Sequence, residues 1–372
     1  MSTLKVNTIR HTGASSDAVT LASDGTCTAK ITNQPPGNRN KVINGAMTIS
    51  QRNGNSAVQL SASEQYFIDR WENDTGSSFD MKCDASQSSE APEGFSKSMK
   101  FDCDGVSSVS GSHNGLITTF IEGQDLQDLK FGTSNAEDLT LSFYAKSGSQ
   151  NNGHVYGVFL GAYLSGTRNA QTKGFTVTSS WQRFTMTFAG TGTVQSTDIN
   201  ANNSKGLQVA FSLACGPDDE QNYSTWTANS NLLGFTGQDN FFDNTSNELY
   251  ITGVQLEVSD HATDFEHRSY GDELRRCQRY YERLENVTCQ LYVKWGNGDL
   301  RAPLFFQVTK RDTPTVTNSG GTFTNYNPDG WATNTPSISD ISTTSCCLNS
   351  NRGGAENTMN VVGVDLLIAS EL

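Results

Sequence analysis

Short segments in which apolar and polar residues alternate run through most of the chain. In residues 79–83 the apolar side chains of Phe79, Met81 and Cys83 occupy every second position, and residues 67–71 repeat the spacing. A period of two is typical of half-buried β-strands. Similar segments between turn-forming residues lie at 96–103, 115–123, 139–147, 154–164, 182–190, 206–214 and 248–257. Roughly ten strands are too many for one flat sheet, so a jelly-roll β-sandwich is expected.

One segment has helical periodicity instead. Within residues 269–285 the side chains of Leu274, Cys277, Tyr281 and Leu284 fall on one face at helical spacing. Acidic residues begin the segment and arginines follow, as the helix dipole favours. About three turns of helix are marginal in isolation, so this helix is expected to dock on its own sandwich or at a symmetry axis. We assign Leu274, Cys277 and Tyr281 to an oligomer interface.

The remaining segments complete an all-β architecture. Residues 286–372 resume the strand pattern and predict a smaller C-terminal β domain, while residues 1–37 contain two short extended pieces that cannot hold a core alone. The predicted order is an extended anchoring arm (1–37), a jelly-roll sandwich (38–268), a linker helix (269–285) and the C-terminal β domain. An arm of this size is expected to pair with another copy of the chain or another protein.

Composition excludes several classes of partner. Charged residues make up 17% of the chain, hydrophobic residues 35%, and the net charge is −13. Clustered Lys and Arg are needed to hold phosphates, so nucleic acid and anionic membranes are poor partners. The chain has no apolar run long enough for a membrane span or a secretory signal, which predicts assembly in a cytoplasm. Eight cysteines without C-x-x-C spacing are interpreted as small buried residues in a reducing compartment.

Several stretches, taken together and in order, resemble a known group of proteins. They are residues 38–53 (NRNKVINGAMTISQRN), 66–72 (YFIDRWE), 139–147 (LTLSFYAKS), 251–258 (ITGVQLEV) and 265–282 (FEHRSYGDELRRCQRYYE). This set resembles the carbohydrate-binding-module-like jelly roll of tail fibres and related structural proteins of tailed bacteriophages. The opening MSTLKVNTIR is similar to the short N-termini of fibres from marine podoviruses.

The resemblance implies a role in a virion. It implies a homotrimeric structural protein, assembled in the host cytoplasm, whose N-terminal arm attaches to other tail or capsid proteins. The opposite end would meet the host, through a cell-surface glycan or protein, with no nucleic acid bound and no membrane insertion. Two alternatives stay open. One is a glycan-degrading depolymerase tailspike, and the other is a capsid or tail decoration or adaptor protein without a receptor role.

Catalytic motifs are absent from the sequence. The five histidines are dispersed without an H-E-x-x-H pair, and no G-x-S-x-G occurs. Glycoside cleavage requires two carboxylates about 5–10 Å apart, which 39 acidic residues leave open. No residue is assigned a catalytic role, and a protein without enzymatic activity is expected.

Two polar loops carry aromatic residues without an obvious core role. Tyr223 and Trp226 lie in NYSTWTANSN, and Tyr326 and Trp331 lie in NYNPDGW. Sugar rings stack on aromatic faces while neighbouring amides and carboxylates bind the hydroxyls, so these four residues are candidate glycan contacts. Packing under a loop or at a subunit interface is the alternative for each pair.

Two groups of charged residues, the acidic loops and the residues around the helix, are expected to stabilise the fold. Acidic residues in the loops 102–105, 217–222 and 243–248 make a structural calcium ion an option, although they lack the EF-hand pattern and no metal ligand is assigned. Around the helix, a carboxylate–guanidinium network is expected to lock the helix to the sandwich, or one subunit to another. Its members are Glu266, Arg268, Tyr270, Arg276, Arg279 and Glu282.

Overall fold

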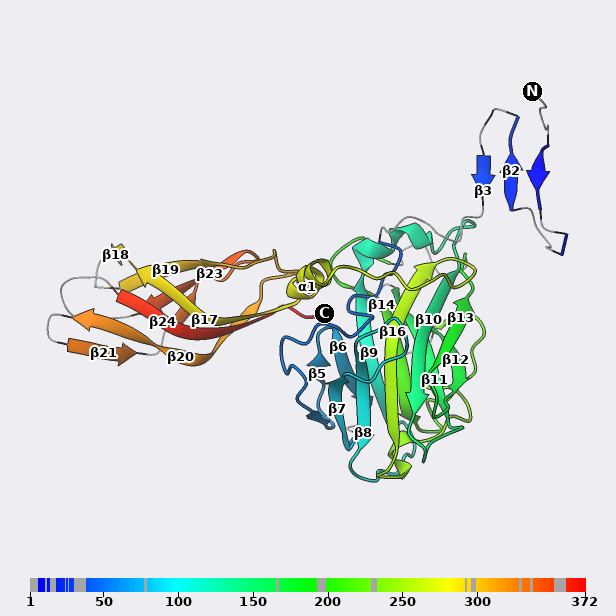
Figure 1. The fold of residues 1–372 in the computed structure, drawn as a ribbon, viewed down its shortest axis with the longest axis horizontal. Helices are drawn as coiled ribbons and strands as arrows, with labels where there is room; N and C mark the ends of the chain where they lie inside the picture. The colour runs from blue at the N-terminus through cyan, green and yellow to red at the C-terminus, as the bar shows by residue number, and fades with distance from the viewer. Residues whose placement is uncertain are drawn as a thin grey trace.

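The computed structural model describes residues 6–10, 12–13, 18–23, 25, 27–29, 38–76, 79–164, 167–192, 199–228, 233–291, 293–295, 299–327, 330–334, 337–350 and 359–372. These residues form a small N-terminal sheet, a two-sheet sandwich, one α-helix and a distal pair of sheets (Figure 1). The architecture confirms the predicted all-β class, with a jelly-roll sandwich and a smaller C-terminal β domain joined by a short helix.

Two antiparallel sheets form the sandwich. The six-stranded sheet contains, in spatial order, β13 (Gln182–Phe188), β10 (Leu139–Ser147), β16 (Glu248–Val258), β8 (Ser98–Cys103), β7 (Cys83–Ser88) and β4 (Val58–Leu60). The seven-stranded sheet contains β15 (Thr227–Ala228), β12 (Thr167–Thr176), β11 (Val155–Leu164), β14 (Lys205–Cys215), β9 (Asn114–Glu122), β6 (Trp71–Gly76) and β5 (Gln65–Ile68). Short 3₁₀ turns, η1 (Gly123–Leu129) and η2 (Phe241–Asp243), lie in its loops.

Aromatic side chains fill the space between the two sheets. Phe143 of β10 packs edge-on against Phe175 of β12 and Phe211 of β14, with ring centroids 5.0 Å apart in both pairs. Phe184 of β13 stacks on Phe143 at 5.3 Å. Because successive strand residues point to opposite faces, these rings mark the inner face of each strand. The core therefore reaches the β12 and β13 edge of the sandwich.

The predicted continuous strand through residues 67–71 is wrong in one respect. The chain reverses there, and β5 pairs with β6 as a tight antiparallel hairpin. Arg70 at the turn has φ of +71°, a left-handed conformation that a turn requires. Phe67 and Trp71 still reach the core, both at most 1% exposed, because they flank the turn on the inner side.

The helix α1 (Tyr270–Gln278) leads from the sandwich to the distal domain. The side chain of Ser269 accepts a hydrogen bond from the Asp272 backbone N–H at 3.2 Å and caps the helix. The distal domain has two four-stranded sheets. One contains, in spatial order, β17 (Tyr281–Leu291), β24 (Met359–Ala369), β20 (Thr315–Asn327) and β21 (Gly330–Asn334). The other contains β18 (Val293–Trp295), β19 (Asp299–Phe305), β23 (Ser345–Ser350) and β22 (Ser337–Ser339). Within the described chain, no helix has the length and apolar character to cross a membrane.

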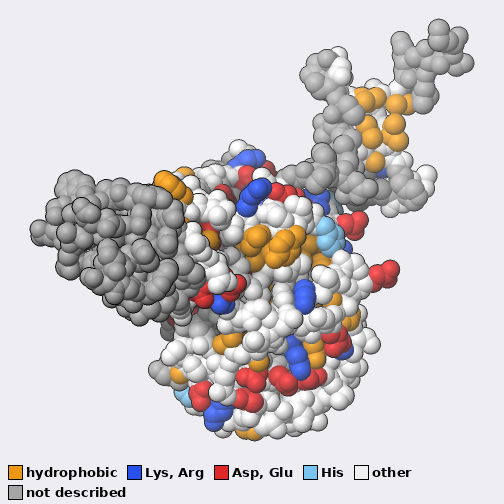
Figure 2. All heavy atoms as spheres, turned by 60° about the vertical axis from the view of Figure 1, so that its left-hand side comes forward, with side chains coloured by type: hydrophobic (Ala, Val, Ile, Leu, Met, Phe, Trp, Pro, Cys, Tyr) orange, Lys and Arg blue, Asp and Glu red, His pale blue; other side chains and the backbone are white. Residues whose placement is uncertain are grey.

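The N-terminal sheet stands apart from the sandwich, on the side away from the distal domain (Figure 1). It consists of β1 (Thr8–Ile9), β2 (Val19–Leu21) and β3 (Cys27–Ala29). Val6, Ile9 and Leu21 are 37%, 54% and 40% exposed. Figure 2 shows hydrophobic side chains gathered on this small sheet. A sheet this small leaves apolar surface in water that a partner would cover.

The glycine of the ITGVQLE stretch, Gly253, lies in a β-bulge of β16. The register between β10 and β16 shifts between Ser142 and Tyr144, and Gly253 within the bulge has φ of +63°. A Cβ at this glycine would lie 2.7 Å from the ring of Phe95. The next residue, Val254, donates its N–H to the Gly45 carbonyl at 2.9 Å. The bulge therefore makes room for an aromatic ring and receives residues 40–45.

The segments that carry the family resemblance contact one another. The carboxylate of Glu266 accepts the Asn40 backbone N–H at 2.7 Å, and Arg268 pairs with Glu266 at 3.2 Å and Glu273 at 3.3 Å. Arg268 also donates to the backbone carbonyl of Val42 at 3.2 Å. The FEHR and NRNKVING stretches thus lock the start of the helix to the sandwich. Their chemistry is structural.

A second lock lies at the far end of the helix. Glu122 of the seven-stranded sheet is fully buried and accepts from Arg279 Nε at 2.7 Å and from the Tyr280 hydroxyl at 2.6 Å. Burial alone would raise the pKa of Glu122, but these hydrogen bonds outweigh it and hold the pKa below its ordinary value. The predicted network therefore extends to Glu122, and Glu282 pairs instead with the buried Lys310.

Candidate functional site

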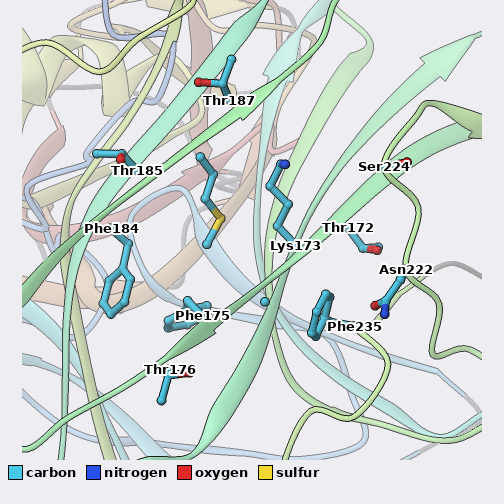
Figure 3. A pocket seen from close by; sticks show the side chains of 12 residues that line it. Thr172, Lys173, Phe175, Thr176, Phe184, Thr185, Thr187, Asn222, Ser224 and Phe235 are labelled. Carbon is cyan, nitrogen blue, oxygen red and sulfur yellow. The ribbon is translucent and has the colours of Figure 1, made fainter.

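A groove opens at the edge of the sandwich, where β13 of one sheet faces β12 of the other. Its volume is about 720 Å³, within the range of small-molecule sites. Figure 3 shows Lys173, Phe175 and Phe184 in the space between β12 and β13, whereas Thr185 and Thr187 point away from it and Phe235 lies on the other side of β12. The described lining consists of Thr172, Lys173, Gly174, Phe175, Thr176, Phe184, Thr185, Met186, Thr187, Asn222, Ser224 and Phe235.

The apolar part of the groove is the margin of the core, where Phe175 is buried and Phe184 and Met186 are partly exposed. Phe175 and Phe184 pack edge-on at 5.2 Å, and Met186 follows Phe184 on the same side of β13. Phe235 lies against Gly174 so closely that a Cβ there would be 2.5 Å from its ring. The glycine lets this ring rest directly on the strand, which gives the groove an aromatic surface.

Hydroxyl groups surround this apolar surface. Thr185 alternates with Phe184 and Met186 on β13 and is exposed. Thr176, Thr185 and Ser224 line the groove and make no side-chain hydrogen bond with any described residue. Aromatic rings cover the C–H face of a sugar while hydroxyls and amides bind its oxygen atoms. The arrangement therefore suits a carbohydrate.

A polar network on the outer face of the seven-stranded sheet is a second cluster. Gln208 is fully buried, and its amide nitrogen donates to Thr118 Oγ1 at 3.0 Å. Its amide oxygen accepts from the Tyr163 hydroxyl at 3.3 Å and from Arg168 Nη1 at 3.4 Å. Because Gln208 uses its groups within the chain, this network stabilises the sheet and offers less to a ligand than the groove does.

One carboxyl group near this network has a perturbed pKa. Glu72 on β6 is 7% exposed, and burial raises its pKa to about 7, although a hydrogen bond with Tyr66 and the charge of Lys205 act in the opposite direction. Lys205 itself lies 3.8 Å above the ring of Phe120. Glu72 therefore takes up a proton close to neutral pH, a property with consequences for stability.

The predicted aromatic residues Tyr223 and Trp226 pack against the sandwich. Tyr223 covers the outer-face cluster that includes Phe159. The Trp226 indole N–H donates to the Ala189 carbonyl at 2.7 Å, and its ring meets Phe131 edge-on at 5.2 Å. A glycan contact through either ring stays a prediction. The same loop reaches the groove through Asn222 and Ser224, the residues on either side of Tyr223.

The other predicted sites are only partly described. Tyr326 and Trp331 face each other in the β20–β21 hairpin, and their side chains lie outside the described part of the structure. Cys277 is 1% exposed and Tyr281 is 6% exposed, so the chain itself covers both. Of the three predicted interface residues, only Leu274 keeps intermediate exposure. Trimer contacts through these positions stay untested.

The acidic loops considered for calcium do not converge. Among the described residues, no three His, Cys, Asp or Glu side chains gather as a metal site. Asp102 pairs with Lys100 at 2.9 Å, and Asp243 accepts from the Asn247 side chain at 2.8 Å. These two carboxylates therefore have partners within the chain, and structural calcium stays an untested option.

Sequence reasoning did not find the groove. A glycine inside QTKGFT can signal a close approach of another group to the strand, and alternation in FTMTF places threonines and apolar residues on opposite faces. Neither pattern shows that β12 and β13 lie at the same edge of two different sheets. Only the strand order brings their side chains together.

Comparisons with known proteins give distant structural similarity alone. No protein-family model matches the chain. No curated protein matches it either. Among solved structures, the enzymatically active domain of tailspike protein 4 of bacteriophage CBA120 is 13% identical, with a TM-score of 0.30, and the match covers 59% of this chain and 21% of that one.

Carbohydrate-binding modules give matches of the same order. A family 11 module of a Clostridium thermocellum cellulosomal cellulase is 12% identical, with a TM-score of 0.28, and the match covers 57% of this chain and 99% of that module. The CBM22-1 xylan-binding domain of Paenibacillus barcinonensis Xyn10C is 9% identical, with a TM-score of 0.28, covering 56% and 97%. The chain thus has a β-sandwich with distant similarity to carbohydrate-binding modules and to a phage tailspike domain.

Proposed function

We propose that this chain is a tail-fibre-type structural protein of a tailed-bacteriophage virion, without enzymatic activity, that binds a host-surface glycan through the β12–β13 groove. The groove carries the binding part of the proposal. It combines the partly exposed rings of Phe184 and Phe235 with lining hydroxyls that have no described partner, the two features that sugar recognition needs.

The virion role is supported by the sequence resemblance and by the placement of the parts. The N-terminal sheet exposes Val6, Ile9 and Leu21 and projects away from the distal domain (Figure 1). Apolar surface on a sheet that lacks a core is what an anchoring arm would bury against another virion protein. The homotrimeric state and the location in the virion derive from the resemblance.

Glycan binding is tested by blocking the groove. The purified full chain is screened against a panel of neutral and acidic oligosaccharides, and Thr185→Trp is compared with wild type. Thr185 is exposed and has no side-chain partner in the described chain, so an indole there fills the groove without removing a core contact. We expect at least about a tenfold loss of affinity, or about 1.4 kcal/mol.

Gln182→Trp is the matched control, because Gln182 is exposed on the same strand and does not line the groove. Equal losses in both variants, or none in Thr185→Trp, would remove the groove from the proposal. Two further measurements address the rest. The mass of the protein in solution distinguishes a trimer from other states, and release of reducing ends from a bound polysaccharide would establish the depolymerase alternative.

A further inference from the structure

The charge of the groove differs from that of the chain. The protein has 39 acidic and 26 basic residues, yet the described lining contains one charged side chain, the ammonium of Lys173. Among the described residues no carboxylate lines the groove. An opening with a cation and no acid, on a protein with net charge −13, favours an anion over a neutral or cationic ligand.

Lys173 also lacks an ion-pair partner among the described residues. Other lysines of the chain form ion pairs, such as Lys100, Lys130 and Lys146. Lys173 forms none with any described residue, and its recorded contact is with the ring of Phe188, 5.4 Å from the ammonium. A ligand anion would therefore meet a positive charge that no carboxylate of the described residues neutralises.

The position of Lys173 relates this charge to the aromatic surface. It precedes Phe175 by two residues on β12, so both side chains leave the strand on the same side. Figure 3 shows the ammonium extending away from the rings of Phe175 and Phe235, toward Thr187. The partly buried Phe184 and Met186 line the same groove, so a sugar ring resting on them would present a substituent at its edge to the ammonium.

We propose that the groove binds an anionic sugar unit, whose ring lies on Phe184 and Met186 and whose carboxylate or sulfate group pairs with Lys173. This inference rests on the proposed glycan-binding function and names the ligand class of the same site. The lining residues Thr176, Thr185 and Ser224, whose hydroxyls bond to no described side chain or backbone group, bind the sugar hydroxyls, and the ion pair adds preference for the acid form.

The test uses isothermal titration calorimetry on the full chain with three groups of probes. Oligogalacturonate and oligomannuronate supply carboxylates, oligosaccharides of a sulfated galactan supply sulfate esters, and methyl-esterified oligogalacturonate and desulfated galactan are the neutral counterparts. We expect at least one acidic probe to bind about five- to tenfold more tightly than its neutral counterpart. Raising NaCl from about 50 to about 500 mM should shrink this preference, because salt screens an exposed pair.

The decisive variant is Lys173→Gln, which keeps much of the side-chain length and removes the charge. It should bind the acidic and the neutral probe with equal affinity. Lys97→Gln is the matched control, since Lys97 contacts only neutral groups of Asn55 and Ser89 in the described chain and lies outside the groove. It makes the same change in net charge and should retain the preference.

Each outcome has a defined meaning. Equal binding of acidic and neutral probes by wild type, or a preference that survives Lys173→Gln, overturns the anionic-ligand proposal. If neutral glycans bind and Thr185→Trp abolishes that binding, the glycan-binding function stands without it. If no probe binds, both are refuted. Carboxylated and sulfated probes, compared with each other, identify which anion the groove prefers.

Discussion

The last residues of the chain fasten the distal domain to the sandwich. Beyond β24, Glu371 places one carboxylate oxygen 2.6 Å from Arg70 Nη1 and the other 2.7 Å from Arg52 Nη2. The guanidinium of Arg70 also lies 3.5 Å from the ring centroid of Tyr280, and the Arg311 side chain donates to the Glu371 carbonyl at 2.7 Å. Replacing Glu371 with glutamine removes the charge and keeps the shape.

The expected loss follows from the burial of Arg70. Its side chain is 1% exposed, and Glu371 is its charged partner among the described residues. Removing one member of a buried ion pair costs about 3–5 kcal/mol, because the remaining charge stays out of water. The amide oxygen that Glu371→Gln introduces still accepts one hydrogen bond, so we expect a loss of about 3 kcal/mol in the free energy of unfolding.

The assay is urea denaturation followed by calorimetry. A loss of this size lowers Tm by roughly 6–12 °C for domains of this length. Glu285→Gln is the control, because Glu285 also lies in the distal domain and pairs with Arg283 at 2.9 Å, but is 57% exposed. Exposed pairs contribute about 0–1 kcal/mol. If Glu371→Gln is as stable as Glu285→Gln, the buried pair does not hold the two domains together.

Three further predictions concern stability. The folded pKa of Glu72, about 7, exceeds its ordinary 4.5, so the stability that its protonated form contributes is fully present below pH 4.5 and is lost as pH rises through 7. The free energy of unfolding of Glu72→Gln, measured by urea titration, should therefore rise by about 3 kcal/mol relative to that of wild type between about pH 4.5 and 8. Parallel curves of unfolding free energy against pH would contradict this. Gly253→Ala should cost about 2–4 kcal/mol in the same assay, because a Cβ meets the Phe95 ring at positive φ, and an unchanged midpoint would disprove the need for glycine. Arg279→Ala should lower Tm by several degrees by leaving the buried Glu122 without its cation, and an unaltered Tm would remove this lock.

Local sequence patterns predicted the core positions of the strands but not the turn at Arg70 or the residues that line the groove. Alternation identified Phe79, Met81 and Cys83 as core, since the period of a strand is fixed by its backbone. The same spacing concealed the turn at Arg70, because a tight hairpin also returns side chains to the inner face. Tyr223 was singled out as a ring in a polar loop, although its neighbours are the ones that line the groove.

The sequence by itself determined the all-β class, the sandwich, the short helix at residues 270–278 and the acidic character, because these follow from residue periodicity and composition. The tertiary structure decided which residues meet. It brought residues of β12 and β13 together in the lining of one groove. It also placed Glu371 against Arg52 and Arg70, which lie some 300 residues earlier in the chain. Such pairings depend on strand order and domain docking, which no local pattern specifies.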